Sequence, residues 1–196
     1  MFKIINAENS DPKYGILRHN EGVDFISGNI KLLDLETALA NIINRKFVLR
    51  TYVEQQKTYY DYILIDCPAR SGMMLINSLA CTDSVLIPTQ AAYLSINGLQ
   101  SLIKTIGNVK RQVNPKIEIE GILFTMFNNC TNYAKEIRTL LVENYGNHVQ
   151  IFKNYIPMST KVAEAPATGM SIYKYDPHGN ATSAYESLVK QILANK

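Results

Sequence analysis

The sequence predicts an α/β fold: an open, mostly parallel sheet with helices on both faces. The first observation is that short apolar runs alternate along the 196 residues with longer amphipathic segments. The second is that these runs are apolar at nearly every position, which is typical of strands covered on both faces. Repeated alternation of strand and helix then implies right-handed crossovers between parallel strands.

Four apolar runs and a weaker fifth are expected to form the strands. The stronger runs stop at or close to a polar residue or a proline, and such residues punctuate the ends of strands. The expected strands are residues 62–65, 84–87, 119–125 and 149–156, with 23–26 as the weaker fifth.

The clearest helix is expected over residues 95–113, where apolar positions recur every three or four residues and form one stripe. Asn114-Pro115 ends it, because the residue before a proline disfavours helical geometry. Further helices are expected over 73–81 and 181–194, and from residue 32 to about 57 as one long or two broken helices.

A helix near residue 132 begins at a capping residue, either Thr131 or Asn132. Gly146 is expected to end it in a left-handed conformation. Its buried side is expected to consist of Ile137, Leu140, Leu141 and Tyr145.

Composition narrows the class of protein. The length fits one domain over residues 1–196. Lys and Arg number 20 against 17 Asp and Glu, so the formal charge of +3 argues against a dedicated polycationic arm. Mean hydropathy is −0.08, and no apolar run approaches the ~20 residues of a membrane helix. We therefore expect a cytoplasmic protein without a membrane partner.

Asp66 is the sharpest candidate site residue, because it ends an apolar strand and ligands of open α/β sheets bind beyond such ends. A carboxylate there can hold Mg²⁺ directly or through a water, since this ion keeps several waters and needs few protein ligands. Equally, Asp66 can accept backbone hydrogens in the turn before Pro68. The residues alone leave both interpretations open.

Complete catalytic motifs are missing from the sequence. None of the ten glycines precedes a lysine, so the phosphate-binding loop GxxxxGK[ST] is absent. Cys67 has no nearby histidine that would favour its thiolate. Lys110 and Arg111 end a predicted helix, where cations complement the helix dipole and a DNA contact is the alternative.

An ordered set of motifs runs from about residue 20 to the C-terminus. It comprises YDYILIDCP at 60–68, INSL at 76–79, DSVLIPTQ at 83–90, GLQSL at 98–102, IEGILFTM at 119–126, IP at 156–157, AEAP at 163–166, Gly169 and YDP at 175–177. Together these motifs resemble the ParA/Soj-type partitioning ATPases, relatives of MinD with a P-loop NTPase fold. Each motif alone is weak, whereas their order and spacing are specific.

The resemblance implies ATP and Mg²⁺ as the family's cofactors. Asp66 resembles the Walker B carboxylate, linked indirectly to Mg²⁺, and the segment after it resembles a switch that senses the γ-phosphate. The switch-like positions are Cys67, Pro68 and Gly72, and the positions bordering the adenine are Thr125, Met126, Pro157 and Met158.

The family's partners follow from the same resemblance. Such proteins form an ATP sandwich dimer, bind DNA without sequence preference at the nucleoid, and hydrolyse ATP when a ParB-type protein stimulates them. The candidate DNA contacts here are Lys110, Arg111 and Lys161. So few phosphate contacts imply weak binding that fades steeply with salt.

One part of the family pattern has no counterpart: its first strand, the Walker A loop with two lysines, a helix and a second strand. We therefore expect a chain truncated at the N-terminal side, which by itself neither holds ATP tightly nor hydrolyses it. Without the central first strand, the runs at 62–65 and 84–87 would expose unpaired backbone. These strands are expected to close against each other, or the chain to self-associate or take a strand from a partner.

Two alternatives come from other functional classes. A phospho-receiver domain would use Asp66 as its acceptor, but it also needs an acidic pair after the first strand and a lysine after a later one. Here Asp24 lies inside its run and Met126 follows Thr125. A non-catalytic regulatory module derived from the same family would use the helix at 95–113 and bind partners regardless of nucleotide.

Overall fold

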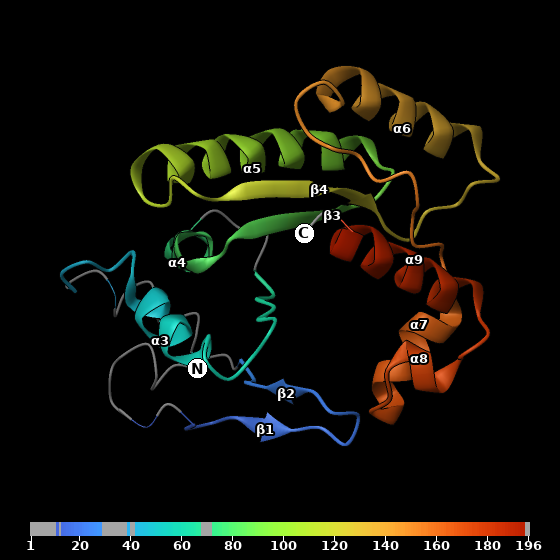
Figure 1. Ribbon diagram of the computed structural model, residues 1–196. Coiled ribbons are helices and arrows are strands. Elements are labelled where there is room, and N and C mark those ends of the chain that lie inside the picture. The colour runs from blue at the N-terminus through green and yellow to red at the C-terminus, as the bar shows by residue number, and fades with distance from the viewer. Residues whose placement is uncertain (1–10, 12, 29–38, 40–41, 68–71, 195–196) are drawn as a thin grey trace. The chain divides into compact units, whose positions relative to one another are not determined.

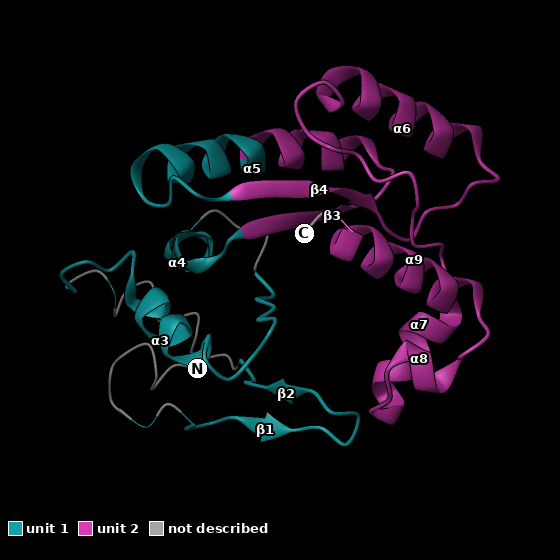
Figure 2. Cartoon of the chain, viewed as in Figure 1, with its two compact units in different colours: residues 1–83, 102–117 teal, residues 84–101, 118–196 magenta. Residues whose placement is uncertain are grey.

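Parallel strands and helices make up the fold, as the sequence predicts. The computed structural model describes residues 11, 13–28, 39, 42–67 and 72–194. The chain divides into two compact units, one of Met1–Asp83 with Leu102–Ile117 and the other of Ser84–Ser101 with Glu118–Lys196 (Figure 2). The expectation of a single domain over 1–196 stays a prediction.

The second unit contains the parallel sheet, in which β3 (Ser84–Thr89) pairs with β4 (Glu118–Phe124) (Figure 1). Both strands were predicted. The register shifts between Val85 and Leu86, whose partners are Ile119 and Gly121. Such a shift adds one residue to β4 and bends it locally.

The predicted strand at 149–156 forms only isolated parallel bridges beside β4. Ile122 and Ile151 form one bridge, with the Ile122 amide donating to Gln150 at 2.8 Å and the Phe152 amide donating to Ile122 at 3.0 Å. Pairing resumes further on, where the Ile156 amide donates to the Phe124 carbonyl at 2.8 Å. The prediction of a continuous strand is therefore wrong, although the segment does follow the sheet.

Helices complete the second unit and cover its sheet. A buried apolar cluster joins Leu123 of β4 and Phe152 to Leu188 of the C-terminal helix. The helices that lie wholly in this unit are α6 (Asn132–Tyr145), α7 (Thr160–Glu164), the 3₁₀ helix η2 (Ala165–Thr168), α8 (Ile172–Tyr175) and α9 (Asn180–Ala194).

Helix α5 (Tyr93–Gln112) follows β3, and its residues belong to both units. Its buried side chains include Leu99, Ile106 and Val109, as the predicted stripe requires. Asn114 lies beyond its end and donates to the carbonyls of Leu79 and Thr82, at 3.0 and 2.8 Å. The described part of the chain contains no helix with both the length and the apolarity needed to cross a membrane.

The first unit holds a small antiparallel pair, β1 (Leu17–Arg18) with β2 (Asp24–Phe25), and two helices. These helices are α3 (Val48–Gln56) and α4 (Met73–Cys81). Buried Asn77 connects them, because its side chain accepts from the Leu49 amide and donates to the Arg45 and Met73 carbonyls.

Residues 62–65 belong to neither sheet of the described chain, so the strand predicted there is wrong. Ile63 and Ile65 still pack against a cluster of α3 and α4 side chains, while Leu64 is 92% exposed. The alternation is that of a half-buried strand, but backbone pairing needs a neighbouring strand. The expected closure of 62–65 against 84–87 is likewise not observed.

The remaining helix predictions hold except at three points. The helices expected at 73–81, near 132 and at 181–194 are α4, α6 and α9. Of the region from 32 to about 57, the described helical residues are Leu39 and 48–56, while 29–38 and 40–41 lie outside the described residues. Thr131 does cap α6, accepting from the Ala134 amide at 3.4 Å. Leu140, expected to be buried, is 42% exposed.

Gly146 does not adopt the left-handed conformation expected of it. Its φ is −62°, and its amide donates to the Val142 carbonyl, so the helical turn continues through it. A Cβ at this position would lie 2.5 Å from that carbonyl oxygen. Close approach of the backbone is therefore the physical reason for a glycine here.

Candidate functional site

The carboxyl ends of β3 and β4 lie at one edge of the sheet, where the backbone of Thr125 is fixed. Its amide donates to the Thr89 carbonyl at 2.8 Å, and its hydroxyl reaches the same oxygen at 3.4 Å. Thr89 is itself buried as the last residue of β3. The residue after β4 is thus held by the end of its neighbouring strand.

The segment after residue 156 reaches the same edge. The Phe127 amide donates to the Ile156 carbonyl at 3.0 Å, and the Met158 amide donates to the Phe127 carbonyl at 3.4 Å. Phe127 and Pro157 form a parallel bridge. The structure therefore brings together the four residues predicted to border a nucleotide, which are Thr125, Met126, Pro157 and Met158.

Met126 has an unusual backbone at this edge. Its φ is +50°, a left-handed conformation that costs a residue with a Cβ about 1–2 kcal/mol. The side chain is 53% exposed, and its Sδ lies 3.2 Å from Nε2 of Gln90. Hydrogen bonds of both flanking residues sustain the strained conformation.

Two exposed tyrosines next to these strand ends were missed by the sequence reasoning. The Tyr93 amide at the start of α5 donates to the Tyr133 hydroxyl in the first turn of α6, at 3.1 Å. Tyr93 and Tyr133 are 40 positions apart, and no motif or local spacing in the sequence indicates that they are in contact. Gln90 and Met126 are 36 positions apart, so their contact likewise arises only from the pairing of β3 with β4.

Asp66 lies in the first unit and is exposed, within residues 62–67, which belong to no helix or strand. Cys67 is half-buried, and its Sγ lies 3.5 Å from the Ile65 carbonyl oxygen. Burial raises the pKa of the Cys67 thiol, so the thiol stays protonated at neutral pH and is a poor nucleophile. Gly72 caps α4 and accepts from the Ile76 amide. Pro68 lies outside the described residues.

The donor set restricts how a cation can bind. Over the described residues, His, Cys, Asp and Glu side chains form no cluster of three or more that could enclose a metal. An exposed carboxylate such as Asp66 does fit Mg²⁺ held chiefly by water and phosphate oxygens. The water-linked role for Asp66 thus agrees with the residues present and stays a prediction.

The three predicted DNA contacts belong to two environments. Lys110 and Arg111 are exposed in the last turn of α5, and Arg111 Nη2 donates to Asn108 Oδ1 at 2.6 Å. Lys161 lies in α7, where its ammonium is 3.5 Å from the Glu164 carboxylate. The free positive charge at Lys161 is therefore smaller than the sequence suggests.

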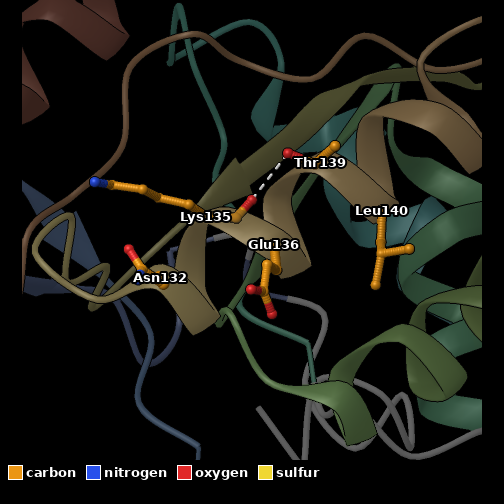
Figure 3. Close-up of a pocket in the computed structure, with 5 residues that line it drawn as sticks. All are labelled: Asn132, Lys135, Glu136, Thr139 and Leu140. Atoms are coloured by element: carbon orange, nitrogen blue, oxygen red, sulfur yellow. Dashed lines mark hydrogen bonds between the residues drawn. The ribbon is translucent and has the colours of Figure 1, made fainter.

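An open hollow of about 540 Å³ lies along α6 (Figure 3). All of its lining residues come from that one helix, and the Thr139 hydroxyl within it donates to the Lys135 carbonyl at 3.0 Å. None of the predicted site residues lines it. The hollow is lined by Asn132, Lys135, Glu136, Thr139 and Leu140.

Sequence comparisons relate the chain to known proteins. The AAA domain family matches residues 1–119. The sporulation initiation inhibitor protein Soj of Bacillus subtilis is 35% identical over 89% of this chain and 68% of its own length. The chromosome partitioning protein ParA of Myxococcus xanthus is 37% identical over 83% of this chain and 56% of its own. The chromosome-partitioning ATPase Soj of Treponema pallidum is 31% identical over 93% of this chain and 69% of its own length.

Solved structures with the same fold are more distant in sequence. McdA of Cyanothece in complex with ATP superposes with a TM-score of 0.85 at 18% identity, over 98% of this chain and 74% of that one. A plasmid partition protein of Borrelia burgdorferi superposes with a TM-score of 0.75 at 21% identity, over 100% of this chain and 72% of that one. Cobyrinic acid a,c-diamide synthase of Mycobacterium smegmatis, with a bound ATP analogue and magnesium, superposes with a TM-score of 0.75 at 23% identity. The superposition covers 81% of this chain and 62% of that one. At these identities the likeness establishes the fold alone.

Proposed function

We propose, because the chain belongs to the ParA/Soj family of partitioning proteins, that it acts in the segregation of a chromosome or plasmid. The observation that carries this proposal is the shared sheet edge of Thr125, Met126, Pro157 and Met158. Ligands of open α/β folds bind at such edges. The chain spans 56–69% of the length of the three relatives, so the activity of a whole family member enters here only as a proposal.

ATP with Mg²⁺ is the ligand that we assign to the family's site. Two proteins of the same fold bind ATP or its analogue, one of them together with magnesium. Within the second unit, the exposed edge residues Met126 and Met158 would border the base. Independently, the family resemblance assigns to the exposed Asp66 of the first unit the binding of a water of the magnesium ion. Mg²⁺ would supply charge neutralisation of the phosphates, and Cys67 and Gly72 would follow the state of the terminal phosphate.

The 196 residues by themselves are not expected to hydrolyse ATP. They contain no Gly-Lys pair, and therefore no loop whose amides and lysine could hold the β- and γ-phosphates. Titration of MgATP into the purified chain should give no micromolar binding by calorimetry and no phosphate release. The Soj ATPase of Treponema pallidum is the positive control. Micromolar binding with turnover would contradict this prediction.

DNA is the macromolecular partner that the basic residues support. We infer weak, sequence-independent binding through Lys110, Arg111 and Lys161, all of which are exposed. A ParB-type protein would bind as the stimulating partner, and self-association would follow the family. A nucleotide-independent binding module is the second candidate function, and it would use the exposed Lys110 and Arg111 at the end of α5. It predicts that ATP leaves the DNA affinity unchanged.

Neutralising Lys110 or Arg111 should weaken binding to random-sequence duplex DNA equally for every sequence. Each Lys110→Gln or Arg111→Gln change should also reduce the slope of log K against log salt by about one, because one phosphate contact is lost. Fluorescence anisotropy at several salt concentrations measures both quantities. Lys190→Gln on α9 makes the same charge change at another exposed position. An equal loss for Lys190→Gln would refute a specific role for the α5 residues.

A further inference from the structure

Lys161 is held in a closed three-residue network at the corner between α7 and α8. Its Nζ lies 3.5 Å from the Glu164 carboxylate and 5.5 Å from the centre of the Tyr175 ring. The Tyr175 hydroxyl donates to the same carboxylate at 3.0 Å. Each residue therefore contacts the other two, and we call this set the Lys161–Glu164–Tyr175 triad.

The triad compensates the charge of Lys161 in two ways. The carboxylate supplies an opposite charge, and the face of the Tyr175 ring attracts a cation through its quadrupole. The hydrogen bond from Tyr175 orients Glu164 and raises the pKa of the tyrosine, which consequently stays a neutral donor at physiological pH. The pair is half exposed, with Lys161 and Glu164 side chains 54% and 50% accessible, so an incoming anion can compete for the ammonium.

We propose that Glu164 and Tyr175 restrain Lys161, so that a DNA phosphate gains this lysine only by displacing the Glu164 carboxylate. Glu164 and Tyr175 are then positioning residues that weaken DNA binding, and Lys161 is the residue that touches the phosphate. The inference rests on the proposed DNA binding. It adds that the ion pair between Lys161 and Glu164 competes with the DNA phosphate, which lowers the affinity for DNA and speeds dissociation.

A double-mutant cycle tests the restraint. Glu164→Gln should raise the association constant for duplex DNA about two- to fivefold at low salt, the range that exposed ion pairs allow. Tyr175→Phe keeps the ring but removes the hydroxyl donor, and it should give a smaller gain in the same direction. Both gains should disappear in a Lys161→Gln background. Glu143→Gln, an exposed glutamate on α6, controls for the loss of one negative charge.

A second measurement needs no DNA. Limited acetylation with an N-hydroxysuccinimide ester, followed by mass spectrometry, reports how available the Lys161 amine is relative to Lys190. Acetylation of Lys161 should rise at least twofold in Glu164→Gln and stay unchanged in Glu143→Gln. This readout separates the inference from the proposed function, because it succeeds even if the chain does not bind DNA.

The outcomes are distinct. An unchanged acetylation ratio in Glu164→Gln would overturn the restraint, as would a gain in DNA affinity that persists in the Lys161→Gln background. If no variant binds DNA while the acetylation ratio rises, the restraint on the amine holds and the proposed DNA binding fails. Coupled gains in both measurements would support the inference and the proposed function together.

Discussion

Replacing Phe124 by alanine should lower the free energy of unfolding by about 3–5 kcal/mol, the usual cost of truncating a fully buried phenylalanine. Phe124 is 0% exposed at the end of β4. Its ring lies 5.4 Å from that of Phe127, which in turn lies 4.7 Å from Tyr155. Removing the Phe124 ring therefore leaves a cavity beside Phe127, whose backbone is held by its hydrogen bond to Ile156.

Urea denaturation followed by circular dichroism measures this change as a fall in the transition midpoint. Phe25→Ala is the matched control, because the same atoms are removed from a side chain that is 44% exposed. Its effect should be well below half of that at Phe124. Equal effects at the two positions would show that Phe124 is not part of the packed core.

Gly121→Ala should destabilise the protein by about 2–4 kcal/mol through backbone strain and steric overlap together. Gly121 lies at the register shift of β4 with φ +155°, a conformation that residues with a Cβ rarely adopt. A Cβ there would lie 2.6 Å from Cε2 of Phe152 and 3.0 Å from the Gln150 carbonyl oxygen. The ring can shift, but the backbone oxygen accepts a hydrogen bond from Ile122 and cannot move freely.

Gly107→Ala is the control with the opposite expected sign. Gly107 lies inside α5, and nothing within 4 Å would meet its Cβ. Alanine favours the helix over glycine by about 1 kcal/mol, so this variant should unfold at a higher urea concentration than the wild type. A neutral or stabilising Gly121→Ala would contradict the geometry at the register shift.

The sequence predicts correctly those helices and strands whose signals lie within a few consecutive residues. The stripe on α5, the capping Thr131 of α6 and the apolar runs of β3 and β4 all lie within short windows of sequence. The edge residues Thr125, Met126, Pro157 and Met158 could also be anticipated from the family resemblance, because their motifs are intact.

Non-local contacts explain the errors. Residues 62–65 form a continuous apolar run, as a buried strand does, yet strand formation depends on a neighbouring strand that a local pattern does not specify. Leu140 fits the apolar stripe of α6, but which side of a helix is covered depends on the packing of the whole unit. The contact between Glu164 and Tyr175 spans 11 positions and likewise carries no signal in its spacing.

Met126 gives the sheet edge a property beyond its shape. Its positive φ is enforced by the pairing of Thr125 with Thr89 and of Phe127 with Ile156. The loss of conformational entropy in this backbone therefore occurs during folding. A ligand that binds at the edge would not have to order the backbone, so its binding would not carry that cost. Such preorganisation would favour rapid, lock-and-key association over a slow conformational adjustment.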